Sequence, residues 1–219
     1  MSIIENLQFV IPTPVVDDNG ISNYNYPKFK IKNIENKGLG VVATEDLTKQ
    51  DINKVLIYGG ILLTYKQYKK FNKINNDLNF ENNSCNSIIS YIAKANDHYL
   101  NANPILYNDD TKMGWIGSYV NEVSKISNSV YNAELIVLSP EDLKEYQLQI
   151  NKLPDCINKT HIVGIRIKYT VKKGQEITAY YGESFIRNNY KQKEPQITYN
   201  EDGSSLVIND NVNFLTPKK

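Results

Sequence analysis

Short runs of alternating apolar and polar residues recur along this chain and predict a domain built mainly of β-strands. Apolar residues alternate with lysines over 29–32, turn residues follow at 36–38, and an apolar run occupies 41–43, which together predict a β-hairpin. Gly59 and Gly60 interrupt the next apolar stretch and indicate a bend where another backbone or a ligand can come close. The other strands are expected at 7–11, 55–58, 61–63, 88–92, 99–100, 133–138 and 162–169, with a late hairpin at 197–199 and 206–208.

Helical spacing is confined to two segments, so the expected fold class is mainly β with short helices, of the α+β kind. Thr64 can cap a helix over 64–71. Ser139, followed by Pro140 in the first turn, can cap a second helix that runs to Ile150. This second helix is expected as an insertion between two strands.

The composition fits one globular domain that carries appendages. The chain has 219 residues, of which 41% are hydrophobic, enough for one core and too few for several. Proline and turn residues predict an irregular leader over 1–27, and the Asn-rich stretch 72–86 predicts a loop or a loosely helical insertion. No apolar run approaches the roughly 18 residues that cross a bilayer, and residues 1–10 lack the pattern of a signal peptide. An intracellular location, nucleus or cytoplasm, and no membrane partner are therefore expected.

Charge and cysteine content exclude several classes of protein. The 25 Lys and Arg residues against 24 Asp and Glu give a net charge of +1, so no direct nucleic-acid site is expected. Cys85 and Cys156 are too few and too far apart for a disulfide scaffold or a metal site built from cysteines. A reducing compartment and no resident metal are the resulting expectations.

The glycines at 38–43 and the two histidines are the first candidates for chemistry. Residues 38–43 match the G-x-G-x-x-A dinucleotide fingerprint, but no helix is expected to open there, and no acidic residue lies between Asp51 and Asp77. A glycine turn between two strands is the simpler interpretation, and a dehydrogenase is a distant alternative. His98 and His161 have no acid or nucleophile at a recognisable spacing and are interpreted as ordinary structural or surface histidines.

Three sets of segments, considered in their order along the chain, indicate a more specific function. They are 37–43 (KGLGVVA), 118–121 (SYVN) with 132–135 (NAEL), and 171–182 (VKKGQEITAYYG). In that order they resemble the SET domain of protein-lysine methyltransferases. The last segment is similar to the family's G-E-E-L-T-x-D-Y-G run, and Tyr58-Gly59-Gly60 is similar to its Y-x-G element.

The resemblance implies a SET-domain fold of several small sheets with a knot-like C-terminal segment and helical insertions. The SET domain would occupy 28–183, after the leader 1–27, with insertions near 66–90 and 139–160. The family's Cys-rich zinc flanks are absent from this sequence. The tail 184–219 would therefore act as a post-SET segment without zinc and close the lysine channel.

The same resemblance implies an enzyme that transfers a methyl group from S-adenosyl-L-methionine to a lysine side chain of a protein or peptide, either a histone tail or a non-histone protein. Leu39 and Gly40 would offer backbone groups to the amino acid end of the cofactor, and Asn121 would anchor its methionine part. Glu122 would bind the adenine edge through its main chain, and Tyr119 would line the cofactor pocket.

Two tyrosines carry the chemistry that the resemblance implies. The hydroxyl of Tyr181 would lie at the methyl-transfer pore, and Tyr58 would line the lysine channel from the facing strand. Ala179 stands where the family often carries a Phe or Tyr, which implies a larger pocket. Glu122 and Val123 replace the family's His and Ser, and this departure motivates a second hypothesis, a catalytically silent SET-like module that binds a protein partner.

Overall fold

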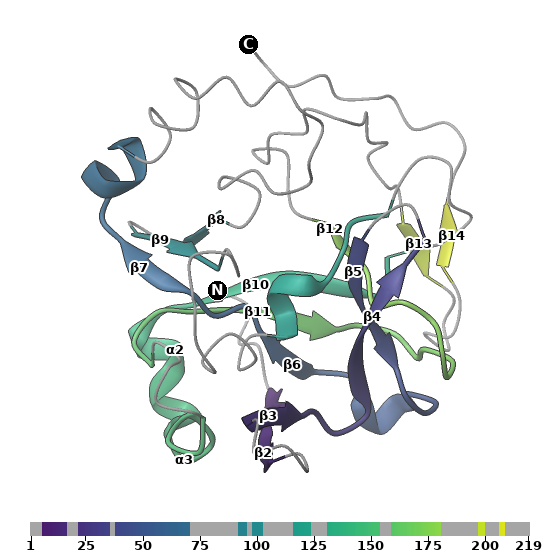
Figure 1. Ribbon diagram of the computed structural model, residues 1–219. Helices are drawn as coiled ribbons and strands as arrows, with labels where there is room; N and C mark the ends of the chain where they lie inside the picture. Colours follow the sequence, from purple (N-terminus) through teal and green to yellow (C-terminus); the bar gives the residue numbers. More distant parts are fainter. Residues whose placement is uncertain are drawn as a thin grey trace.

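The computed structural model describes residues 6–16, 22–35, 38–70, 92–95, 98–102, 116–123, 131–153, 159–180, 197–199 and 206–208. This part of the chain is mainly β, with a few short helices and several small sheets, as the hydrophobic pattern predicts (Figure 1). The strands are β1 (Gln8–Phe9), β2 (Thr13–Val16), β3 (Ser22–Asn25), β4 (Phe29–Ile34), β5 (Gly38–Ala43), β6 (Lys54–Ile57), β7 (Ile61–Leu63), β8 (Ile92–Ala95), β9 (His98–Asn101), β10 (Ala133–Leu138), β11 (Ile162–Ile167), β12 (Ala179–Tyr180), β13 (Ile197–Tyr199) and β14 (Leu206–Ile208). The helical elements are η1 (Lys49–Asp51), η5 (Ile116–Tyr119), α2 (Pro140–Glu145), α3 (Gln147–Ile150) and residues 65–70.

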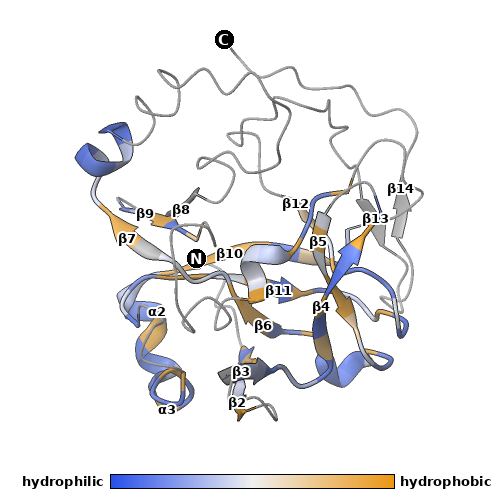
Figure 2. Ribbon diagram, viewed as in Figure 1, coloured by the Kyte–Doolittle hydropathy of each residue, from blue (hydrophilic) through white to orange (hydrophobic). Residues whose placement is uncertain are grey.

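The largest sheet has five strands in the order β1-β6-β11-β10-β12. β11 is antiparallel to both β6 and β10, whereas β1 and β12 join the two edges as parallel strands. Leu56 and Ile165 lie opposite each other in this sheet and are fully buried. Figure 2 shows apolar residues concentrated on β6, β10 and β11, as expected for strands that supply a core.

The predicted hairpin and the predicted bend are both confirmed. β4 and β5 pair in antiparallel register, with Ile31 opposite Val41. Gly59 (φ 55°) and Gly60 (φ 130°) turn the chain from β6 into β7, which belongs to a separate sheet with the order β7-β9-β8. A Cβ at Gly60 would lie 2.7 Å from the carbonyl oxygen of Asn101, so the glycine allows the close approach of β9.

The strand expected at 7–11 is confirmed as β1, but the prediction that the rest of the N-terminal leader is irregular was wrong, because its described residues also form β2 and β3. β1 lies beside β6 as a parallel strand, and the neighbouring Leu7 and Phe9 are buried in the core. β2 and β3 form a hairpin of their own, with Pro14 opposite Tyr24. The partner of β1 is distant along the chain, and no strands were expected at 13–16 and 22–25, so the local pattern revealed neither the pairing of β1 nor this second hairpin.

The predicted helix after residue 138 is confirmed, although it is interrupted. The hydroxyl of Ser139 accepts a hydrogen bond from the Asp142 N–H (3.2 Å), and the Asp142 carboxylate accepts one from the Ser139 N–H (2.8 Å). α2 ends at Tyr146, whose buried ring packs edge-on against Phe9 with ring centroids 5.9 Å apart. Gln149 of α3 accepts a hydrogen bond from the Phe9 N–H (2.9 Å), which attaches this insertion to the edge of the sheet.

The predicted helix at 64–71 and the late hairpin are confirmed as far as the described residues reach. Residues 65–70 are helical, and the Thr64 hydroxyl accepts a hydrogen bond from the Gln67 N–H (3.3 Å). β13 and β14 form the late antiparallel hairpin. The strand expected at 88–92 reaches the described residues only at its last position, and the loop at 72–86 lies outside them. No helix within the described ranges is long and apolar enough to cross a bilayer.

Candidate functional site

The segment 171–180 joins three parts of the chain that are far apart in sequence. Its Ile177 N–H donates to the Val41 carbonyl of β5 (2.7 Å). Its Ala179 N–H donates to the Asn121 carbonyl (3.0 Å), and β12 pairs with β10 in parallel. The segments on which the family resemblance rests therefore lie against one another.

Asn121 lies where these segments meet. Its side-chain Nδ2 donates to the Glu176 Oε1 (2.8 Å) and to the Leu39 carbonyl (3.2 Å). Both amide hydrogens thus form hydrogen bonds within the protein, whereas no donor among the described residues forms a hydrogen bond with the Asn121 Oδ1. The side chain is only half-buried, so this oxygen is an acceptor available to a bound molecule.

Gly40 is the glycine that permits this arrangement. A Cβ at Gly40 would lie 2.6 Å from the Ile34 Cγ1, 2.7 Å from the Asn121 Nδ2 and 3.0 Å from the Glu176 Oε1. The absence of a side chain is therefore required by the protein's own packing. Residues 38–43 form strand β5 and do not open a helix, which argues against the dinucleotide fingerprint. The glycine-turn interpretation fits only Gly38, which begins the strand with a φ of 79°, whereas Gly40 lies inside the strand and pairs with Lys32.

The solvent side of the site lies at the start of β5. Leu39 is 53% exposed. Gly38 is also exposed and has a φ of 79°, and a Cβ there would meet no described atom within 4 Å. A ligand can therefore approach the backbone at Gly38 and Leu39 from solvent.

Asn132 is a site residue that the sequence analysis did not single out. Its Nδ2 donates to the Glu176 carbonyl (2.8 Å), and its Oδ1 accepts from the Thr178 N–H (3.0 Å). One buried amide side chain thus fixes the backbone of this segment at two positions, Glu176 and Thr178, beside Asn121. Asn132 begins one of the quoted segments, but asparagine is so frequent in this sequence that its identity carried little signal.

The η5 turn connects Asn121 to Tyr58. A Cβ at Gly117 would lie 2.6 Å from the Ile57 carbonyl oxygen, so η5 sits directly on the end of β6, and it also packs against β5. Tyr58 follows β6, is buried, and donates its N–H to the Val163 carbonyl (2.9 Å). Tyr119, the last residue of η5, is half-buried, and this burial raises the pKa of its hydroxyl.

The predicted site residues therefore divide into three groups. Leu39, Gly40 and Asn121 are in direct contact or adjacent, and Glu122 follows Asn121 with its side chain buried. Tyr58 and Tyr119 are connected to them through η5. Tyr181 lies outside the described residues, so its predicted position is not described.

The residues just before Tyr181 pack against β10 and Tyr131. Ala179 is fully buried in the core and pairs with Ala133, so the space at this position belongs to the core. Tyr180 packs edge-on against Tyr131, with ring centroids 5.9 Å apart. No set of three or more His, Cys, Asp or Glu side chains in the described part of the chain is arranged to hold a metal ion.

No protein-family model matches this chain, and no curated protein matches it.

Proposed function

We propose that this protein is a protein-lysine methyltransferase with a SET-type fold that uses S-adenosyl-L-methionine. The observation that carries the proposal is the meeting of Leu39, Asn121 and Glu176 around one amide side chain. These residues come from the three segments that resemble the SET family, and nothing in their local sequences requires them to meet. The resemblance predicts this meeting, whereas chance similarity of short segments does not.

The site has groups that suit the cofactor. The Asn121 Oδ1 is an acceptor, which matches the ammonium group of the methionine part. The exposed backbone at Gly38 and Leu39 is open on its solvent side, so a flat or extended ligand can lie along it. Glu122 keeps its main-chain donor and acceptor, which are the groups that the resemblance assigns to the adenine edge.

The reaction requires a neutral lysine amine. S-adenosyl-L-methionine supplies a methyl group on a sulfonium centre, and the lysine nitrogen needs its lone pair to attack it. An ordinary lysine has a pKa of about 10.4, so bringing it to neutrality near pH 8 requires a shift of about two units, or roughly 3 kcal/mol. Tyrosine rings around the amine supply part of this shift by removing it from water, and the positive charge of the donor adds to it.

We assign the residues of this chain to holding the reactants in line. Tyr58, buried at the end of β6, would line the lysine channel, and the Tyr181 hydroxyl would lie at the methyl-transfer pore. Asn121, oriented by Glu176 and Leu39, would fix the cofactor so that its methyl group faces the channel. Such positioning is the main source of rate enhancement in a transfer between two bound reactants.

Calorimetry with S-adenosyl-L-homocysteine tests the binding half of the proposal. We expect one saturable site, and we expect Asn121→Ala to weaken binding by about 10- to 100-fold, the loss of one hydrogen bond to a charged group. Asn151→Ala is the matched control, because Asn151 is exposed at the end of α3, and it should bind like the wild type. An absence of heat and of thermal stabilisation in the wild type would contradict the proposal.

Methyl transfer is tested separately with radiolabelled cofactor on histones and on a whole-cell lysate, followed by mapping of the labelled residue. Tyr181→Phe should remain folded and lose most of the transfer rate. Transfer at the wild-type rate by this variant would show that the role assigned to Tyr181 is wrong.

The second candidate is a catalytically silent SET-like module that binds a protein partner. It is favoured by Glu122 and Val123, which stand in place of the family's His and Ser and are both buried beside Asn121. Binding of S-adenosyl-L-homocysteine without transfer to any substrate, or no binding at all, would favour this candidate. A dehydrogenase is separated from both by thermal shift with NAD, for which we expect no effect.

A further inference from the structure

Three tyrosine rings lie together where the helical residues 65–70 meet β9. The rings of Tyr68 and Tyr99 stack with centroids 4.0 Å apart and planes inclined at only 2°. The Tyr65 ring lies 6.5 Å from that of Tyr68 and 6.3 Å from that of Tyr99, with planes inclined at 29° and 27°. Because Tyr65 is almost equally far from both rings, it lies beside the stacked pair. The stack attaches the helical residues to the β7-β9-β8 sheet, and Tyr65 adds a third ring at its side.

Tyr65 is the ring of this cluster that is most open to solvent. It is 53% exposed, whereas Tyr68 and Tyr99 are half-buried. The Lys69 ammonium lies 4.6 Å from the centroid of the Tyr65 ring, over one of its two faces. No ring of the described residues stacks on Tyr65 at the 4.0 Å that separates Tyr68 from Tyr99. A flat aromatic group from solvent can therefore stack on the exposed ring.

Positive charge surrounds the same ring. Residues 52–76 contain five lysines and no acidic residue. Lys66 and Lys70 are exposed, lie one helical turn apart, and form no ion pair with any carboxylate in the described part of the chain. The expectation of no direct nucleic-acid site rests on the net charge of +1 for the whole chain, and that value does not reveal a local excess of this kind.

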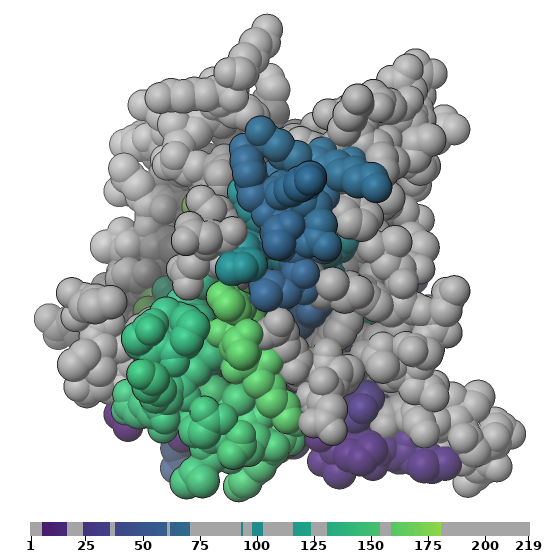
Figure 3. All heavy atoms as spheres, turned by 90° about the vertical axis from the view of Figure 1, so that its left-hand side faces the viewer, coloured from purple at the N-terminus to yellow at the C-terminus, as the bar shows by residue number. Residues whose placement is uncertain are grey.

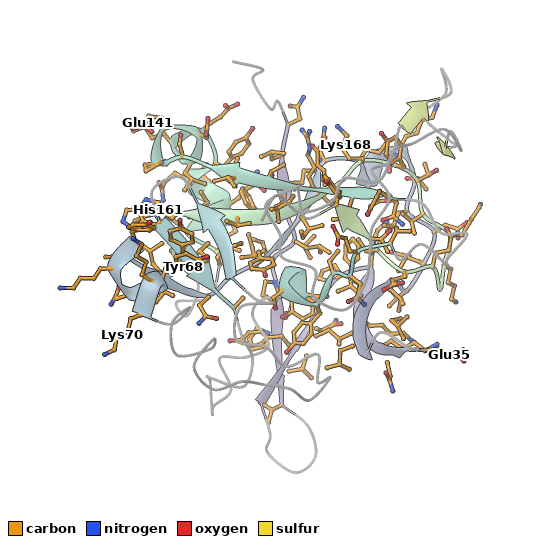
Figure 4. The ribbon with its side chains drawn as sticks, turned by 90° about the horizontal axis from the view of Figure 1, so that it is seen from above. Glu35, Tyr68, Lys70, Glu141, His161 and Lys168 are labelled. Carbon is orange, nitrogen blue, oxygen red and sulfur yellow. The ribbon has the colours of Figure 1, made fainter. Side chains whose placement is uncertain are left out.

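The cluster is at the surface of one end of the molecule. Figure 3 shows the segment that contains residues 65–70, coloured blue, at the surface of one face. In Figure 4, Tyr68 and Lys70 lie at the same end of the molecule, and Glu35 lies at the opposite end. An extended chain can therefore approach Tyr65 and the neighbouring lysines from solvent.

An exposed ring with ammonium groups around it suits single-stranded nucleic acid. Unpaired bases stack on aromatic side chains, while the backbone phosphates contact lysines. A duplex keeps its bases inside, so it would use the lysines and not the ring. An acidic peptide likewise has carboxylates for the lysines but no base to stack on Tyr65. The exposed ring is therefore the feature that favours a single strand over other polyanions.

From this arrangement we infer that Tyr65, Lys66, Lys69 and Lys70 form a binding surface for single-stranded nucleic acid, RNA or DNA. One base would stack on the Tyr65 ring, and the lysines would neutralise neighbouring phosphates. Stacking on an aromatic ring accepts any base, so binding should depend little on the nucleotide sequence. No residue assigned to methyl transfer takes part, so this surface and the proposed activity can be tested independently.

The test is fluorescence anisotropy of the full-length protein with labelled oligo(U) and oligo(dT) of about 12 nucleotides. We expect both to bind, and the tighter of the two identifies whether the partner is RNA or DNA. An unlabelled DNA duplex and poly-L-glutamate should compete about tenfold or more weakly than unlabelled oligo(dT). Tyr65→Leu should weaken binding by about 5- to 150-fold, the range for the loss of one base–aromatic stack, whereas Tyr65→Phe keeps the ring and should bind like the wild type.

The lysines are tested by the dependence of binding on salt. Replacing Lys66 and Lys70 together by Gln should reduce the slope of log affinity against log salt by about 1.4 between about 50 and 200 mM NaCl, since each phosphate contact of a single strand contributes about 0.7. Lys30→Gln with Lys32→Gln is the matched control and should leave the slope unchanged. It removes the same charge from exposed positions of β4, which ends beside Glu35 at the opposite end of the molecule.

A second measurement uses the wild type alone, in case Tyr65→Leu fails to fold. Ultraviolet cross-linking to oligo(U), mapped by peptide mass spectrometry, should place the cross-linked base on Tyr65. The inference is overturned if neither single strand binds at the lower salt concentration, or if the duplex or poly-L-glutamate competes as well as oligo(dT). It is also overturned if folded Tyr65→Leu binds like the wild type, if the Lys66 and Lys70 variant keeps the wild-type slope, or if cross-links form only outside residues 65–70.

Discussion

The hydrogen bond between Asn121 and Glu176 provides the most direct test of the site's construction. In the wild type the Asn121 Nδ2 lies 2.8 Å from the Glu176 Oε1 and 3.2 Å from the Leu39 carbonyl. Asn121→Ala removes both bonds. A net loss of about 1.5–3 kcal/mol for the bond to the carboxylate and about 0.5–1.5 kcal/mol for the other predicts a decrease of about 2–4 kcal/mol in the free energy of unfolding.

Asn121→Asp has the same shape but a different pH dependence. It places a second carboxyl group against Glu176, so one of the two must bind a proton when the protein folds at neutral pH. Holding a carboxyl of ordinary pKa protonated costs up to about 4 kcal/mol at pH 7 and about 1.4 kcal/mol at pH 5. Because the folded variant binds more protons than the unfolded chain, its stability should rise relative to the wild type as the pH falls.

Urea unfolding at pH 7 and pH 5 measures both effects. The stability difference between wild type and Asn121→Asp should shrink by about 2–3 kcal/mol between these values, whereas that of Asn121→Ala should change little. The double variant Asn121→Asp with Glu176→Gln is the matched control, because it keeps only one carboxyl and should lose the extra pH dependence. A stability difference for Asn121→Asp that is equal at the two pH values would refute the contact.

Three further predictions concern the framework around the site. Asp51 is buried, and although burial alone raises its pKa, hydrogen bonds from Lys54, from the Thr48 N–H and from Lys28 lower it to about 2. Because the unfolded value is 3.8, this lowered pKa contributes about 2–3 kcal/mol to the free energy of unfolding above pH 4. Measurements of stability against pH should show this contribution being lost as the pH falls towards 2. Asp51→Asn should abolish that loss. Gly117→Ala places a Cβ 2.6 Å from the Ile57 carbonyl oxygen and should lower the free energy of unfolding in urea by about 1–3 kcal/mol. An unchanged urea midpoint would count against the packing of η5 on β6. Ser139→Ala removes the cap of α2 and should cost about 1 kcal/mol in the same measurement, and no loss would mean that water replaces the cap.

The local part of the fold could be predicted from the sequence because local residues determine it. The β4–β5 hairpin has its own alternation and turn, and Ser139 with Asp142 forms a capping box within four residues. The bend at Gly60 was predictable because glycine adopts a φ such as 130° without steric strain and has no Cβ to keep another backbone away.

Long-range pairings were not predictable from local patterns. β1 pairs in parallel with β6, and β12 pairs in parallel with β10, and each of these edge strands has only two residues. Tyr146, the residue between α2 and α3, packs against Phe9, which lies far away in the sequence. The same limit applies to His98 and His161, whose ring centroids lie 4.6 Å apart, since nothing in the local sequence of either residue indicates the other.

The site itself was predictable only where the resemblance named a residue. Leu39, Gly40 and Asn121 could be placed together because the family pattern orders their segments. Asn132 and Glu176 hold those segments in place through side chains, yet the pattern gives them no chemical role. Their importance follows from which backbone groups need partners in the folded protein, and that is a property of the three-dimensional arrangement.

The segment 171–180 links ligand binding to the stability of the whole domain. Its backbone pairs with β5 through Ile177, with the Asn121 region through Ala179, and with the turn before η1 through Val171 and Leu47. Because these contacts all close long loops, they are expected to form and break together with the core. A molecule that binds at Asn121 therefore binds only to the folded protein, and it should raise the unfolding free energy of the whole domain as its concentration exceeds the dissociation constant. A ligand that bound without stabilising the protein would have to bind the unfolded chain as tightly as the folded one, and so would not depend on the junction of these segments.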